Sequence, residues 1–288
     1  MDTFEDLGLN PELVESLASE GLEEPTELQA DLLPVLLREN SLLVRGGPGS
    51  GVPSACAAGL LQRTQAGPGA PLQGLVLVPV ESEAVEFARS MARLALGTGH
   101  RVAALGGPFA LPELAQVLVG TPDDILAEAE SGRISLDSVH MVCALSADAL
   151  AAPPETGERL EAVRALLARR EDPVQWVMAS EPVSPAVRAF ADAHLKRAVH
   201  IPSDAAREVP PESPVRRGRL ALQVVDTEVG TALAAHVSRL LDGEDVDHVL
   251  LFARTEDRAA DLGDLLALHG LVRGAPGETD RPLWLGVD

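Results

Sequence analysis

Short apolar runs alternate with amphipathic stretches along the first 201 residues, and no other feature of the sequence constrains the fold as strongly. The runs are three to five residues long, which is the length of buried strands rather than of helices. Strands that are apolar throughout and are separated by helices form mainly parallel sheets covered on both faces. The sequence therefore predicts an α/β fold with strands at Ser41–Arg45, Leu75–Val78, Val102–Leu105, Val117–Val119, Val139–Cys143, Val174–Met178 and Val199–Ile201, and helices that include Ser82–Leu96, Glu158–Arg169 and Pro185–Leu195.

A proline-rich stretch divides the chain. Residues 202–217 contain four prolines and have the composition of an interdomain linker. The segment after it repeats the alternation of strand and helix on a smaller scale. We therefore expect a first domain at 1–201, a linker at 202–217 and a smaller unit at 218–288. Within the smaller unit we expect strands at Leu220–Val225, Val249–Phe252 and Leu283–Asp288, helices at Val229–Leu241 and Glu256–His269, and a loop at Gly274–Pro282.

The charge balance is strongly acidic. Asp and Glu number 44 against 23 Lys and Arg, which gives a formal net charge of −21, and Lys196 is the only lysine. One explanation is a GC-rich genome with acids that keep the protein soluble, and the other is an acidic surface matched to a basic partner. Binding to nucleic acid needs cations placed against phosphates. The densest basic cluster, Arg216–Arg219, lies in and just after the linker.

Other sequence features bear on the compartment and on metals. No apolar run reaches the roughly 18–20 residues of a membrane span, and the acidic N-terminus has no signal-peptide pattern. Cys56 and Cys143 are too few for a disulfide framework, and the histidines are dispersed without metal-ligand spacing. We expect a reduced cytoplasmic protein without a membrane span or a metal site.

The segment from Gly21 to Gln29 combines a turn, a helix start and a carboxamide side chain. A Gln at the foot of a helix can pair with the edge of adenine through its amide, and an upstream aromatic such as Phe4 can stack on the base. The structural alternative is that Pro25 and Thr26 start and cap a helix and that Gln29 lies on its surface. These residues alone leave both interpretations open.

Residues 42–53 have the layout of a strand, a glycine-rich loop and a helix. The backbone N–H groups of such a loop can surround a phosphate group. The loop contains Gly49, Ser50 and Gly51 and is followed by Val52 and Pro53. Its shape therefore predicts a phosphate-binding loop, whereas the two residues after it do not supply the usual side chains.

These two segments, in this order, resemble the adenine-binding Q motif and the phosphate loop of DEAD-box RNA helicases. The family's loop ends Gly-Ser-Gly-Lys-Thr, so Val52 stands where the resemblance places the phosphate-binding lysine, and Pro53 where it places the magnesium-binding hydroxyl. The resemblance implies a RecA-like fold. It also implies a vestigial nucleotide site formed by Phe4, Thr26, Gln29, Gly49, Ser50 and Gly51.

The tetrapeptide Leu145-Ser146-Ala147-Asp148 follows a predicted strand at the place where the family has Asp-Glu-Ala-Asp. In the family the first Asp holds Mg²⁺ and the Glu activates the attacking water, and neither Leu145 nor Ser146 can do so. We expect Asp148 to be a surface or capping residue. Farther along, Ser180 is all that is kept of the family's Ser-Ala-Thr.

The segments that contact RNA in the family have changed as well. Glu81 and Asp124 each stand where the resemblance places an arginine, so two cations that would meet phosphates are replaced by carboxylates. Gly106, Gly107 and Thr121 are kept and form a vestigial RNA site by the same resemblance. Thr121 also fits a plain helix start, since proline and acids follow it.

Residues 247–270 resemble the beginning of the family's second RecA-like domain. No later segment resembles those that carry the family's arginine fingers, so we expect this second unit to be incomplete. Its open sheet edge would need to be covered by a partner, by a second copy or by the strand at Leu283–Asp288.

These features together predict a catalytically inactive, helicase-like protein that serves as an interaction or regulatory module. The alternative is an ATP-binding RNA helicase, with or without turnover, whose site is atypical or completed by a partner. We expect no resident cofactor, no Mg²⁺, at most weak binding of ATP or ADP, and weak or absent binding of RNA. The expected partner is a basic protein of the RNA-processing or ribosomal kind, and self-association through the second unit is a further expectation.

Overall fold

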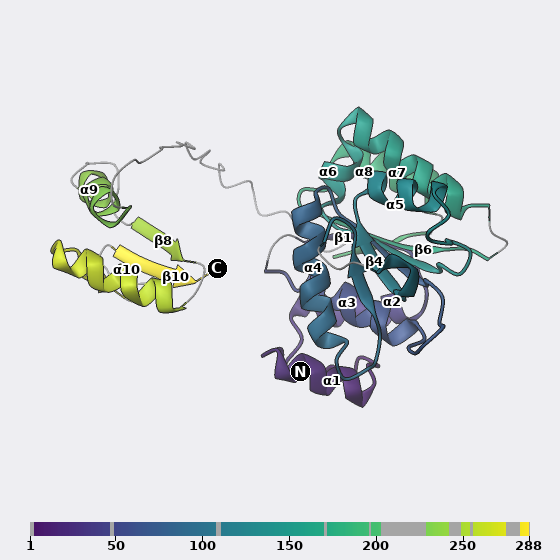
Figure 1. Cartoon of the computed structure of the whole chain (residues 1–288), viewed down its shortest axis with the longest axis horizontal. Helices are drawn as coiled ribbons and strands as arrows, with labels where there is room; N and C mark the ends of the chain where they lie inside the picture. Colours follow the sequence, from purple (N-terminus) through teal and green to yellow (C-terminus); the bar gives the residue numbers. More distant parts are fainter. Residues whose placement is uncertain are drawn as a thin grey trace. The chain divides into compact units, whose positions relative to one another are not determined.

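The computed structural model describes residues 3–46, 49–107, 111–169, 172–195, 197–202, 229–241, 249–253, 256–274 and 283–287. The chain divides into two compact units, Met1–Pro210 and Pro211–Asp288 (Figure 1). The strand expected at Leu220–Val225, the cluster Arg216–Arg219 and all of the linker except Pro202 lie outside the described residues.

The first unit contains a seven-stranded sheet in the order β3-β4-β2-β5-β6-β1-β7, and every pairing in it is parallel. This confirms the predicted α/β fold. Strand β5 begins two residues later than expected, because the Val139 N–H bonds to the Leu136 carbonyl in a turn before the strand. The strands are β1 Leu42–Arg45, β2 Gly74–Leu77, β3 Val102–Ala104, β4 Val117–Gly120, β5 Met141–Ala144, β6 Gln175–Ser180 and β7 Val199–Ile201.

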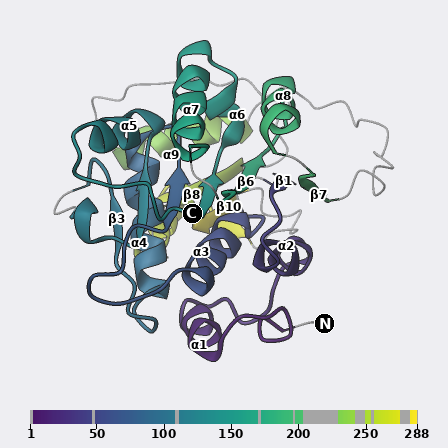
Figure 2. The same cartoon turned by 90° about the vertical axis from the view of Figure 1, so that its right-hand side faces the viewer.

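Helices cover both faces of this sheet (Figures 1 and 2). Because successive side chains of a strand point to opposite faces, Val76 belongs to one core cluster while Leu75 and Leu77 belong to the other. Helices α1 Pro11–Ser19, α2 Glu27–Leu37, α3 Val52–Arg63 and α4 Glu81–Leu94 pack on the Val76 face. Helices α5 Pro122–Glu130, α6 Ala147–Ala151, α7 Pro154–Leu167 and α8 Pro185–His194 pack on the Leu75 face, and a short 3-10 turn, η1 Pro112–Leu114, precedes β4.

The second unit contains a smaller parallel sheet in the order β8-β10-β9 with its own apolar core. Strand β10 pairs with both β8 and β9, so the last strand is central among the described strands. The last strand thus pairs along the edge of β8, as one of the three alternatives expected, and it lies between β8 and β9 rather than at the edge of the described sheet. The elements are α9 Val229–Leu241, β8 Val249–Ala253, α10 Glu256–Leu268, β9 Arg273–Gly274 and β10 Leu283–Val287.

Candidate nucleotide site

The side chains singled out in the sequence gather at the carboxyl edge of the large sheet. The carboxyl ends of parallel strands meet at one edge, which is where open α/β sheets bind ligands. The loop Gly49–Gly51 follows β1, Gly106 follows β3 and Thr121 follows β4. Glu81 comes shortly after β2, Ser146 shortly after β5, and Ser180 is the last residue of β6.

Thr26 and Gln29 form a reciprocal cap at the start of α2. The Thr26 hydroxyl accepts from the Gln29 backbone N–H at 3.2 Å, and Gln29 Oε1 accepts from the Thr26 backbone N–H at 2.8 Å. The predicted helix start is therefore confirmed. The structural alternative was wrong in one respect, because Gln29 is only 2% exposed and does not lie on the helix surface.

The carboxamide of Gln29 also ties α2 to the glycine loop. Its Nε2 group donates to the Gly51 carbonyl at 3.1 Å and to Ser54 Oγ at 2.8 Å. The Thr26 hydroxyl donates to the Ser50 carbonyl at 3.1 Å. Since a carboxamide has two N–H donors, both are used within the chain. Four residues of the expected nucleotide site thus come together, but the group expected to recognise adenine is already bonded.

The described part of the glycine loop makes a tight turn. Gly49 and Gly51 have φ values of +77° and +81°, which glycine adopts without strain. A side chain at Gly51 would also collide with Gln29, since a β carbon there would lie 2.6 Å from Gln29 Nε2. Gly51 occupies the N-cap of α3. Glycine is therefore required at position 51 both by its φ value and by the contact with Gln29; Gly47 and Pro48 lie outside the described residues.

Val52, the first residue of α3, is part of the hydrophobic core and is 1% exposed. Its side chain lies against Gly46, where a β carbon would be 2.8 Å from Val52 Cγ2. Pro53 follows it in the first turn and is exposed. These two side chains provide neither an ammonium group nor a hydroxyl, so the donor set does not fit a magnesium nucleotide.

Phe4 is 2% exposed and packs in the core with Leu7 and Leu9. Stacking on a base would require this ring to leave its apolar surroundings. The structure therefore does not bring Phe4 to the surface as the adenine interpretation expects.

The segment after β5 is held by hydrogen bonds to two neighbouring elements. The Asp148 N–H donates to Ser180 Oγ at 3.0 Å, and the Ser180 hydroxyl donates to the Pro182 carbonyl at 2.9 Å. Leu145 is 8% exposed and joins the core. Ser146 takes a left-handed conformation with φ +51° at the N-cap of α6. Asp148 is therefore neither a cap nor a fully exposed residue; its Oδ1 is buried without a partner among the described residues.

Glu83 in α4 reaches this segment by a hydrogen bond to Ser146. Burial raises the pKa of the Glu83 carboxyl, and the nearby charge of Glu86 adds to the shift. Across the described ranges, no three His, Cys, Asp or Glu side chains are grouped as ligands of a metal ion would be.

Two carboxylates, those of Glu81 and Asp124, lie beside residues of the expected RNA site. The Glu81 side chain lies on Gly106, where a β carbon would be 2.8 Å from Glu81 Oε2. Thr121 caps α5, accepts from the Asp124 N–H at 3.2 Å and donates to Asp124 Oδ2 at 2.7 Å. The Gly107 N–H donates to the Ala104 carbonyl at 3.4 Å. Glu81 and Asp124 thus lie beside Gly106 and Thr121, two residues of the expected RNA site.

Ser54 and Glu83 belong to this edge and were not singled out from the sequence. Ser54 lies in the first turn of α3 and also donates to the Gly51 carbonyl at 2.9 Å. A hydroxyl three residues after the loop's last glycine is a recognisable local signal, since short hydroxyl side chains bond to nearby backbone in a first turn. Glu83 offers no comparable signal, because its partner comes 63 residues later in the sequence.

Comparison with known proteins gives consistent matches over nearly the whole chain. The sequence is 28% identical over 276 residues to ATP-dependent RNA helicase DeaD of Escherichia coli (strain K12), covering 93% of this chain and 42% of that protein. It is 26% identical over 279 residues to the DEAD-box ATP-dependent RNA helicase CshA of Bacillus cereus, covering 94% and 50%. The chain is homologous to DEAD-box RNA helicases. It spans half or less of the length of these curated relatives, and no protein-family model matches it.

Solved DEAD-box structures share the fold. Saccharomyces cerevisiae Dbp5 bound to RNA and ADP BeF3 matches with a TM-score of 0.65 at 20% identity, covering 100% of this chain and 76% of that one. A DEAD box protein from Methanococcus jannaschii matches with a TM-score of 0.62 at 17% identity, covering 99% and 80%. The RecA-like fold of the DEAD-box homologue is thus established. In the part of the chain that the structure describes, no helix is long and apolar enough to cross a membrane.

Proposed function

We propose that this DEAD-box homologue does not hydrolyse ATP and acts as an interaction or regulatory module. One observation carries the proposal: the positions of the phosphate lysine and of the metal-binding carboxylate hold Val52 and Leu145, and both side chains are buried in the hydrophobic core. If Val52 and Leu145 were exposed, a nearby cation or carboxylate could take over the missing role. Because both side chains are packed in the core, there is no space beside them for such a group.

RNA-stimulated release of phosphate from ATP tests this proposal directly. We expect no release above the background of the buffer with RNA alone. The DeaD protein of Escherichia coli, which is named as an ATP-dependent RNA helicase, serves as the positive control. Release that depends on this chain and on RNA would refute the proposal and favour the alternative, an atypical or partner-completed ATPase.

A nucleotide binder without turnover is the second candidate, and the preserved loop Gly49–Gly51 favours it. Thermal shift with ADP or ATP separates the two. If the dissociation constant exceeds the nucleotide concentration, the added stability stays below about 0.4 kcal/mol. We expect that small effect, because Gln29 already uses both N–H groups of its carboxamide within the chain. A larger shift that continues to grow with the logarithm of the nucleotide concentration would favour the second candidate.

The partner and the compartment also belong to the proposal. The net charge of −21 supports a basic protein partner, and we propose a cytoplasmic location for the complex. RNA itself is a poor candidate, since Glu81 and Asp124 present carboxylates at the expected RNA site.

A further inference from the structure

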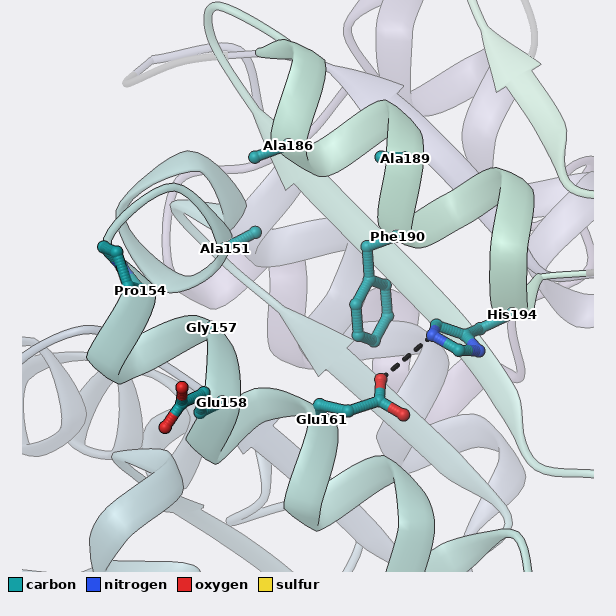
Figure 3. A pocket seen from close by; sticks show the side chains of 9 residues that line it. All are labelled: Ala151, Pro154, Gly157, Glu158, Glu161, Ala186, Ala189, Phe190 and His194. Atoms are coloured by element: carbon teal, nitrogen blue, oxygen red, sulfur yellow. Dashed lines mark ion pairs between the residues drawn. The ribbon is translucent and has the colours of Figure 1, made fainter.

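A groove lies between α7 and α8 on the helical face that α5–α8 cover (Figure 3). It has a cavity volume of about 560 Å³. Four of the nine residues that line it are small, namely Ala151 at the end of α6, Gly157 in α7, and Ala186 and Ala189 in α8. Small residues on α6, α7 and α8 leave this open surface accessible to close approach by another helix.

The floor of this groove is aromatic. Figure 3 shows the Phe190 ring in the middle of the groove, between α7 and α8. Its centroid lies 5.9 Å from that of the buried Trp176 and 4.9 Å from that of His194. Phe190 is only half-buried. The chain has just five Phe, two Trp and no Tyr, so a partly exposed aromatic ring is uncommon on its surface. Aromatic side chains are enriched at protein interfaces, so this partly exposed ring over a packed core is a suitable anchor point for a partner.

Carboxylates line the α7 side of the groove. Glu161 pairs with His194 at 2.9 Å and also with Arg164, which holds the pKa of the Glu161 carboxyl below its usual range. Glu158 is exposed and has no hydrogen-bond or ion-pair partner within the described ranges. The neighbouring Arg159 bonds to Asp123 instead, at 2.9 Å. The groove therefore offers an apolar floor with a free negative charge on its rim.

We propose that this groove docks a basic amphipathic helix of a partner protein, with an apolar side chain over Phe190 and a Lys or Arg beside Glu158. The proposal deepens the function proposed above and rests on its interaction role. Charge complementarity decides the chemistry of the partner, because both the rim and the whole chain are acidic. For the same reason an RNA strand does not suit this groove.

The test uses the full chain and a defined probe. The probe is a fluorescein-labelled helical peptide of about 18 residues with Leu at helical spacing and Lys and Arg on its flanks. A matched peptide carries Glu in place of every Lys and Arg. Fluorescence anisotropy should show saturable binding of the basic peptide only. Equal binding of the two peptides, or no saturable binding of the basic one, overturns the proposal.

Three variants locate the binding. Ala189→Arg fills the groove at an exposed position and should weaken binding by about tenfold or more. Glu158→Lys should weaken it about fivefold. Asp192→Lys makes the same change of net charge on an exposed residue of α8 that does not line the groove, and it should change affinity by less than about twofold. Unchanged binding by Ala189→Arg, or an equal loss in Asp192→Lys and Glu158→Lys, contradicts the site.

Two further measurements separate the remaining outcomes. If the free chain is a dimer in solution and Ala189→Arg makes it monomeric, the occupant is a second copy and the partner helix is refuted. Phosphate release is measured on the same samples. If the peptide does not bind and no ATP is hydrolysed, docking in the groove is refuted and the proposed loss of hydrolysis stands. If the peptide binds specifically and RNA stimulates ATP hydrolysis, docking in the groove stands and the proposed loss of hydrolysis is refuted.

Discussion

Replacing Gln29 with alanine tests whether this side chain now serves the fold rather than a nucleotide. Gln29 is buried and bonds to the Thr26 N–H, the Gly51 carbonyl and Ser54 Oγ. The Gly51 carbonyl keeps its bond from Ser54 after the substitution, so the main loss is the cap on Thr26 together with the space left by the amide. Loss of a cap costs about 1 kcal/mol, and removal of a buried group of this size adds roughly 1–2 kcal/mol.

The expected loss of unfolding free energy is therefore about 2–3 kcal/mol, which lowers the melting temperature by about 4–12 °C in a unit of this size. Intrinsic fluorescence can follow the first unit alone if Trp284 is replaced by Phe, because Trp176 is buried in that unit. The matched control is Asp31→Ala, which changes an exposed residue of the same helix and should alter stability by less than about 0.5 kcal/mol.

A double-mutant cycle with Ser54→Ala then isolates the contact between α2 and α3. Because the two side chains are in direct contact at 2.8 Å, their effects should not add. The reasoning is refuted if Gln29→Ala is no less stable than Asp31→Ala, since the carboxamide would then be dispensable for the fold and free for adenine.

The other predictions concern charge. Val52→Lys should lower the unfolding free energy by about 3 kcal/mol or more in urea titrations, because it places an ammonium group in the core, and it should not restore phosphate release. Glu83→Gln should raise the unfolding free energy at pH 7. The folded pKa of Glu83 is raised, so the ionised carboxylate destabilises the fold above that pKa and has no such effect below the ordinary pKa of a glutamate. The gain should therefore vanish as the pH falls. A gain that persists at pH 3 would contradict this account. Single-stranded RNA should bind with a dissociation constant of about 1 μM or weaker at physiological salt. The double variant Glu81→Arg, Asp124→Arg should bind RNA more tightly and with a steeper salt dependence. Tight, salt-sensitive binding by the unmodified chain would show the prediction wrong.

The periodic parts of the fold could be predicted from the sequence, because strand length and helical spacing are local. The helix at Val229–Leu241 and the strand at Val199–Ile201 have the bounds that the pattern indicates. The place of β10 could not be predicted in this way. Which strand is central in a sheet depends on pairing between distant segments, and the sequence pattern of Leu283–Val287 is the same at an edge or in the middle.

The sequence indicated part of the candidate site but not its bonding. Order along the chain indicated that Thr26, Gln29, Ser50 and Gly51 belong together, and the structure joins them. The burial of Gln29 was not predictable, since its partners Gly51 and Ser54 come 22 and 25 residues later. The groove between α7 and α8 was missed for the same reason, because Glu158 and Phe190 come from different helices and line one groove only in the folded chain.

The burial of Val52 has a consequence for the history of the chain. An exposed valine could be replaced by lysine without disturbing the core. Here the side chain packs against Gly46 and belongs to the core, so the same replacement would first have to disrupt packing that the fold now depends on. Under the proposed function, each later adjustment of the core around Val52 would make a lysine at this position harder for the fold to accommodate.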